Sequence, residues 1–91
     1  MNRTTVNQEI NVTGYYFRHS NMQPVPSSIE YAGRQVKFMN QSMQYLIRKG
    51  QQFVRLFDVT DGDVTYRLKY DPEKVLWTLV YTSGSGMQRG F

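Results

Sequence analysis

The chain has 91 residues, of which 40% are hydrophobic and 14% aromatic, and its formal net charge is +4. This length suits one domain with a single modest core, and the composition is that of a folding chain rather than a disordered one. The sequence contains no Cys, which excludes disulfides, cysteine-based zinc sites and thiol nucleophiles and favours a reducing, cytoplasmic location. It has no apolar run of signal-peptide or membrane-span length, so we expect no membrane contact.

Residues 1–8 are polar and aperiodic, which predicts a flexible N-terminal arm before a single compact β-rich domain over residues 9–82. Glu9 to Arg18 (EINVTGYYFR) is rich in β-branched and aromatic residues, with Ile10, Val12 and Tyr16 on one face of a strand. Gly14 between them indicates a bulge or a close backbone approach.

His19 to Ser28 reads as a connector, because Pro24 and Pro26 prevent a regular helix and bias the preceding residues to extended geometry. The stretch SIEYAGRQVKF after it predicts a hairpin, in which Gly33 supplies a positive φ.

Asn40 to Gly50 (NQSMQYLIRKG) fits two structures. As a helix it would bring Met43, Leu46 and Ile47 to one face, with Gly50 as the C-terminal glycine. As a strand it would turn at Lys49-Gly50 into the next apolar run. The strand is favoured, because an isolated helix of two turns is marginally stable.

The run from Asp58 to Val80 contains the clearest strand signals. Phe53 to Val59 is apolar on both sides and predicts a central strand, and Asp61-Gly62 predicts a tight hairpin turn. After that turn Val64, Tyr66, Leu68 and Tyr70 face one way, and Thr65, Arg67 and Lys69 face the other.

A second turn at Tyr70 to Lys74 leads into a strand from Val75 to Thr82, with Val75, Trp77, Leu79 and Tyr81 on one face. We expect Trp77 to be mainly structural. Residues 83–91 are rich in Gly and Ser, which predicts a flexible tail.

These elements predict a mainly β fold: a small antiparallel meander or half-open barrel of five to seven strands. The alternative is an α+β fold with one short helix at 40–50.

Catalytic chemistry has weak support in this sequence. The lone His19 lies in the connector and is more simply a solvated loop residue, and no residue is marked as a nucleophile. The spacing of Asp58, Asp61 and Asp63 does not match a calcium loop, and turn chemistry explains Asp61-Gly62. We therefore expect a non-enzymatic protein without a cofactor or a metal.

Charge is unevenly distributed along the chain. Tyr31 to Phe57 carries five bases and no acid, and Asp58 to Glu73 carries five acids and two bases. If the sheet gathers the bases, they would form a phosphate-binding face for single-stranded nucleic acid. If residues whose numbers sum to 123 face each other across the hairpin, Arg55 would lie near Lys69 or its diagonal partners. The candidate contacts are Arg34, Lys37, Arg48, Lys49, Arg55, Arg67 and Lys69.

A competing hypothesis rests on strands that are apolar on both sides, such as FVRLF and VLWTLVY. A chain of this length has little core with which to cover both faces, so a partner or a second copy would cover the other. The leading expectation is a small binding module that acts by protein–protein interaction or self-association, with nucleic-acid binding as the alternative.

Overall fold

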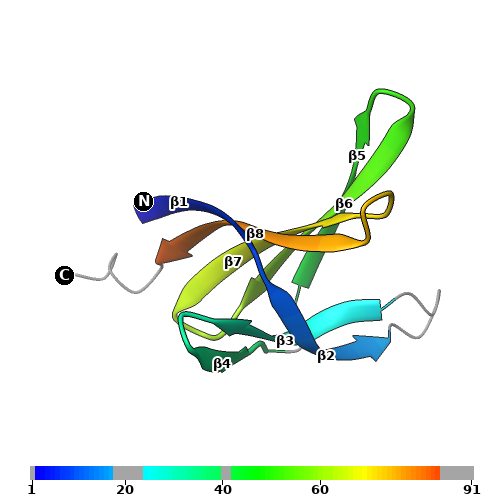
Figure 1. Cartoon of the computed structure of the whole chain (residues 1–91). Coiled ribbons are helices and arrows are strands. Elements are labelled where there is room, and N and C mark those ends of the chain that lie inside the picture. The colour runs from blue at the N-terminus through cyan, green and yellow to red at the C-terminus, as the bar shows by residue number, and fades with distance from the viewer. Residues whose placement is uncertain (1, 18–23, 40–41, 85–91) are drawn as a thin grey trace.

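A computed structural model describes residues 2–17, 24–39 and 42–84, and in these segments every regular element is a β-strand (Figure 1). The strands are β1 (Asn2–Glu9), β2 (Asn11–Phe17), β3 (Pro24–Tyr31), β4 (Arg34–Lys37), β5 (Ser42–Lys49), β6 (Gln52–Thr60), β7 (Val64–Asp71) and β8 (Leu76–Gly84). The prediction of a mainly β, antiparallel domain is confirmed, and the ambiguous segment at 40–50 contains strand β5 rather than a helix. In the described segments no helix is long or apolar enough to cross a membrane.

The strands form two antiparallel sheets of unequal width. The larger has the order β1-β8-β7-β6-β5, and the smaller has the order β2-β3-β4. The chain passes from the larger to the smaller sheet at Ile10, whose amide donates to the carbonyl of Trp77 (3.1 Å). It returns after β4, where the Met39 amide donates to the carbonyl of Thr60 (2.8 Å). Two backbone hydrogen bonds therefore join the sheets at the points where the chain crosses between them.

The first strand corrects the expectation of a flexible arm over residues 1–8. Asn2 to Glu9 form β1, which pairs with β8 in a register that includes Thr5 opposite Tyr81. A bulge between Thr5 and Gln8 and a positive φ at Asn7 (49°) bend the strand. The pairing depends mainly on backbone hydrogen bonds, which polar composition does not reveal, and on Val6, which packs against the core.

Strand β3 corrects the expectation of a connector at His19 to Ser28, because Pro24 to Ser28 belong to it. β3 is the middle strand of its sheet, yet its register with β4 begins only at Ser28. Pro24 and Pro26 therefore lie where β3 is paired on one side, and a residue without an N–H is tolerated there. His19 lies outside the described residues.

Gly14 in β2 meets both of its expected roles. The β2–β3 register shifts on either side of it, and a Cβ at this position would lie 2.8 Å from the Oγ atoms of Ser27 and Ser28. The hydroxyls of Thr13 and Ser28 are hydrogen-bonded at 2.7 Å. The close approach of two backbones thus explains the glycine.

The core lies between the sheets. Phe57, Leu68 and Leu79 from the larger sheet are fully buried against Val25 and Ile29 from the smaller one. The alternation predicted for β7 is confirmed, since Tyr66 and Leu68 are buried whereas Arg67 and Lys69 lie on the other face.

A bulge in β8 corrects the expected face of that strand. Leu68 pairs with Leu79, but Arg67 pairs with Tyr81, so one extra residue lies between the two pairs on β8. Tyr81 is therefore on the outer face with Arg67, opposite the side of Leu79. Val75 does not belong to the strand at all: it lies in the preceding turn with a positive φ (54°) and is 72% exposed.

The turn between β6 and β7 lies one residue later than predicted. The Asp61 amide donates to the Val64 carbonyl (3.2 Å), so Gly62 and Asp63 are the central residues. The Asp61 carboxylate accepts from the amides of Asp63 and Val64, both at 2.9 Å, and from the Tyr66 hydroxyl at 3.3 Å. Burial alone would raise the pKa of Asp61, but these hydrogen bonds outweigh it and lower the pKa below its ordinary value.

Phe57 and Phe53 lie on the same strand and offer a matched test of where the core is. Phe57 is fully buried and Phe53 is 49% exposed. We expect Phe57→Ala to lower the free energy of unfolding by about 3–5 kcal/mol, because it leaves a cavity between the sheets. Phe53→Ala should cost less than about 1 kcal/mol. Urea unfolding followed by circular dichroism measures both values, and equal losses would contradict this assignment of the core.

The Asp61 turn makes a pH prediction. Because the folded-state pKa lies below the unfolded value of about 3.9, the stabilisation is present above that pH and is lost as pH falls through the folded-state pKa. Asp61→Asn removes this titration. We expect the unfolding free energy of the variant to fall less steeply than that of the original chain below about pH 4. Urea unfolding across a pH series measures the slopes, and parallel curves would show that the Asp61 carboxylate does not stabilise the turn.

Candidate functional site

The β5–β6 hairpin projects beyond the body of the molecule (Figure 1). Its strands pair from Ser42 opposite Val59 to Lys49 opposite Gln52, and Gly50 makes the turn with a positive φ (66°). In the described segments, no residue of β5 belongs to the buried core cluster. The hairpin is therefore held to the domain mainly through β6.

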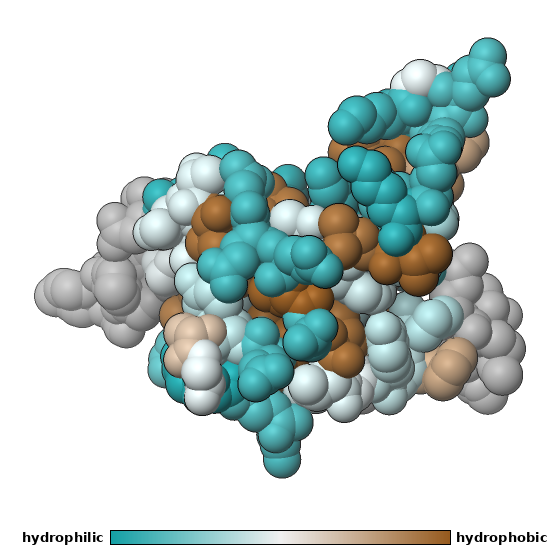
Figure 2. All heavy atoms as spheres, in the orientation of Figure 1, coloured by the Kyte–Doolittle hydropathy of each residue, from teal (hydrophilic) through white to brown (hydrophobic). Residues whose placement is uncertain are grey.

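Large apolar side chains are exposed along this hairpin. Leu46 is 64% exposed and Met43 is 61% exposed, although both types are usually buried. Figure 2 shows hydrophobic atoms among hydrophilic ones on the projecting part. We call these residues the hairpin patch; its members are Met43, Tyr45, Leu46, Ile47 and Phe53.

The patch occupies both faces of β5. Met43, Tyr45 and Ile47 alternate with Gln44, Leu46 and Arg48, so one set lies on the outer face of the sheet and the other on the inner face. The sequence predicted apolar residues on both sides of neighbouring strands. It did not identify this hairpin as the exposed part, because exposure depends on how far the opposite sheet extends.

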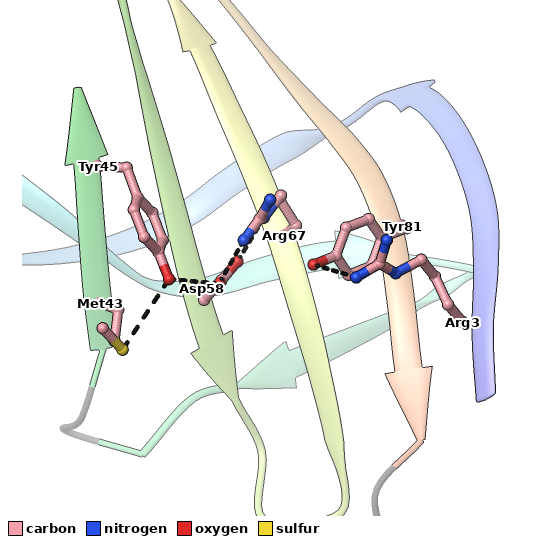
Figure 3. A network of polar contacts seen from close by, with 6 residues as sticks. All are labelled: Arg3, Met43, Tyr45, Asp58, Arg67 and Tyr81. Carbon is pink, nitrogen blue, oxygen red and sulfur yellow. Dashed lines mark hydrogen bonds and ion pairs between the residues drawn. The ribbon is translucent and has the colours of Figure 1, made fainter. Parts of the chain in front are cut away.

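A polar network crosses the outer face of the larger sheet next to the hairpin (Figure 3). Arg67 donates two hydrogen bonds to the Asp58 carboxylate, both at 2.7 Å, and Tyr45 donates to the same carboxylate at 3.2 Å. The Arg67 guanidinium carbon lies 5.2 Å from the centre of the Tyr45 ring and 5.1 Å from that of Tyr81. Arg3 lies over the other end of this row, 4.2 Å from the Tyr81 ring centre.

This network is internally satisfied. The hydrogen bonds to Asp58 raise the pKa of Arg67, so the guanidinium stays charged at all ordinary pH values. Its charge is neutralised by Asp58 and its faces are covered by two tyrosine rings. The network therefore ties β5, β6, β7, β8 and β1 together across the sheet, and its arginine is poorly placed to bind phosphate.

The candidate phosphate-binding residues do not share one surface. Arg34 and Lys37 are exposed on β4 in the smaller sheet, and Arg48 and Lys49 are exposed at the end of β5. Arg67 and Lys69 lie on the outer face of β7. Arg48 donates to the Gly50 carbonyl (3.2 Å), which holds it at the tip. These six residues therefore lie in three pairs, each on a single strand.

Arg55 corrects the expectation that it neighbours Lys69. Its register partner is Tyr70, and directly paired residues share a face, so Arg55 lies on the inner face of the sheet. Lys69 pairs instead with Leu56 on the outer face. Burial lowers the pKa of Arg55, while the nearby Tyr70 acts in the opposite direction.

Trp77 bridges the two sheets. Its ring lies against Phe57 (5.4 Å between centres) and Tyr70 (4.9 Å), and its Nε1–H donates to the Tyr15 hydroxyl on β2 (3.1 Å). The ring is half-buried and packs on the core cluster. These contacts agree with a structural role, although Trp77 also reaches the molecular surface.

Acidic residues do not assemble a cation site in the part of the chain that the structure describes, where no three His, Cys, Asp or Glu side chains lie close enough to hold a metal. Asp58 is engaged by Arg67, and the oxygens of Asp61 cap the turn. The Asp71 carboxylate accepts from the amides of Glu73 and Lys74 in the next turn.

Comparisons with protein-family models, with curated proteins and with solved structures found no match to this chain. Its function therefore has to be inferred from its own residues. The surface that stands out is the hairpin patch, where apolar side chains flank the outermost strand of a sheet.

Proposed function

We propose that this chain is a small non-enzymatic binding module that self-associates, with β5 of one copy pairing antiparallel to β5 of a second copy. The observation that carries the proposal is the exposure of large apolar side chains on both faces of an edge strand. The cysteine-free sequence supports a cytoplasmic location for this activity.

The free edge of β5 supports strand addition. β5 ends the larger sheet, and within residues 2–17, 24–39 and 42–84 no other strand pairs with its outer side. Natural proteins usually protect such an edge with charges, proline or a covering segment. Here the charges, Arg48 and Lys49, stand at the tip, and Met43 to Ile47 carry none. The central part of the edge is therefore open to a partner strand.

The two apolar faces support a second copy as the partner. A strand added to β5 must place apolar residues on both sides, beside Tyr45 and Ile47 on one face and beside Leu46 on the other. β5 itself meets that requirement. A closed two-fold dimer also leaves neither copy with an exposed β5 edge, which limits growth into larger assemblies.

Charge supports the antiparallel direction. In a parallel pair Arg48 and Lys49 would lie beside their own copies. A two-fold axis at Leu46 instead puts Tyr45 opposite Ile47 of the second copy, and Met43 opposite Lys49 of the second copy. Asp58 is the register partner of Met43, so this arrangement brings a lysine toward the row that holds an acid.

A charge at the axis tests the interface. One strand pair is a small contact, so we expect a weak dimer whose average mass rises with concentration from 10.7 kDa toward twice that value. Leu46→Lys places two like charges together and should keep the protein monomeric. Val75→Lys changes a still more exposed residue in the turn before β8 and should not affect association.

Sedimentation equilibrium measures both variants and the original chain. A monomer at every concentration for the original chain would contradict self-association, and binding of labelled oligonucleotides that weakens steeply with salt would favour the alternative function.

Single cysteines test the register, because the chain has no Cys of its own. Across an antiparallel pair, opposite residues have Cα atoms about 4.5–5.5 Å apart, within the range of a disulfide. We expect Leu46→Cys to form an intermolecular disulfide readily under mild oxidation. Arg48→Cys, on the same face two residues later, would face Gln44 of the second copy and should crosslink much less.

Non-reducing gel electrophoresis at several times gives the two rates. Faster crosslinking through Arg48→Cys than through Leu46→Cys would rule out an axis at Leu46.

A further inference from the structure

A pocket of about 340 Å³ opens between the two sheets, on the inner face of the larger one. It lies at the end where β2 finishes and β3 begins, and it is distinct from the free edge of β5. The described residues that line it are Tyr15, Phe17, Pro24, Arg55, Tyr70 and Trp77.

The walls of this pocket are mainly aromatic. Trp77 lies 4.9 Å from Tyr70 and 6.3 Å from Tyr15, measured between ring centres, and its hydrogen bond to the Tyr15 hydroxyl fixes both rings. Phe17 is 60% exposed at the rim. Aromatic rings held in fixed positions offer apolar and stacking contacts to a flat ligand at little cost in conformational entropy.

Arg55 supplies the positive charge in this wall. Its guanidinium carbon lies 4.9 Å from the Phe57 ring centre. With the Gln44 amide oriented to satisfy both groups, its oxygen accepts from Nε of Arg55 at 3.2 Å and also from Nη2 at 2.5 Å. Both of these partners are uncharged. Across the described segments the one ion pair is Arg67 with Asp58, so Arg55 has no carboxylate partner there.

We propose that this pocket binds a small aromatic carboxylate, with the ring between the aromatic walls and the carboxylate on the Arg55 guanidinium. Because the Nε and Nη2 edge of Arg55 faces the Gln44 oxygen, the carboxylate would pair with the Nη1 and Nη2 edge, which also offers two parallel N–H donors. This pairing is stronger where water is partly excluded. Among the described lining residues Arg55 is the one charged group, and one guanidinium balances one negative charge. The aromatic walls and the volume select a ligand about the size of an amino acid.

The lowered pKa of Arg55 agrees with this geometry. Burial lowers it because the charged guanidinium is partly withdrawn from water, and the nearby Tyr70 acts in the opposite direction. An incoming carboxylate would compensate the guanidinium for the hydration that burial removes. Of the predicted phosphate-binding set, Arg55 is the member among the described residues that line this pocket.

Trp77 makes the test direct, since it is the one tryptophan in the chain and lines the pocket. The probe is N-acetyl-phenylalanine, and the matched control is its uncharged amide. Titration is followed by tryptophan fluorescence and by the NMR shift of the indole N–H. We expect saturable binding of the acid, and at least about tenfold weaker binding of the amide, the ratio for one lost charge-assisted hydrogen bond.

Variants assign the effect to Arg55. Arg55→Gln should remove the preference for the acid, and Arg55→Lys should retain part of it. Arg48→Gln removes an exposed arginine at the hairpin tip and should bind as the original chain does.

The proposal is overturned by the absence of saturable binding, by equal affinities for acid and amide, or by an unchanged preference in Arg55→Gln. If Arg55→Gln does not fold, the test rests on the ratio of the affinities for the acid and the amide, measured for the original chain and for Arg55→Lys. Equal ratios in these two proteins, or a ratio of one in the original chain, would overturn the proposal. A peptide with an aromatic residue at its C-terminus, compared with the free acid, then shows whether the pocket accepts a free molecule or a chain end.

Discussion

The larger sheet has five strands and the smaller has three, so the smaller sheet can cover only part of the larger one. The buried cluster lies where the two overlap, around Phe57, Leu68 and Leu79. β5 and the outer half of β6 extend past the overlap. The large apolar side chains of the hairpin patch remain exposed although the chain is well supplied with hydrophobic residues. This mismatch of width determines both surfaces that we propose to be functional.

The free edge and the pocket arise at different boundaries of the same overlap. At the side, β5 has apolar residues on both faces and no strand beyond it in the described segments. At the end, the sheets part near Trp77, and the inner face exposes aromatic rings and Arg55 rather than aliphatic side chains. On the outer face, Arg67 contacts the rings of Tyr45 and Tyr81. This row of side chains links β5 to the rest of the sheet.

Local sequence patterns predicted much of the fold. The strict alternation from Val64 to Tyr70, the glycine at 33 and the marginal length of a helix at 40–50 each led to the observed element. The patterns failed where pairing with a strand distant in the sequence determines the secondary structure. Polar β1 is a strand because β8 offers it an edge, and Pro24 and Pro26 fit β3 because β4 is short.

The candidate site was harder to predict, because a shift of register or a bulge changes the face on which a side chain lies. One extra residue in β8 moves Tyr81 to the outer face, next to Arg67. Pairing with Tyr70 places Arg55 on the inner face, whereas Arg67 and Lys69 lie on the outer one. The exposure of Leu46 depends on the width of the opposite sheet, which cannot be predicted from the sequence of any single segment.

Hydrogen–deuterium exchange of the original chain at low and high protein concentration tests the self-association of β5 most directly. Pairing with a second copy would protect amides along the outer edge of β5, so we predict that exchange in the segment 42–50 slows as concentration rises, while β7 and β8 are unchanged. Exchange in this segment that does not depend on concentration, or protection that appears on another strand instead, would contradict the proposed interface.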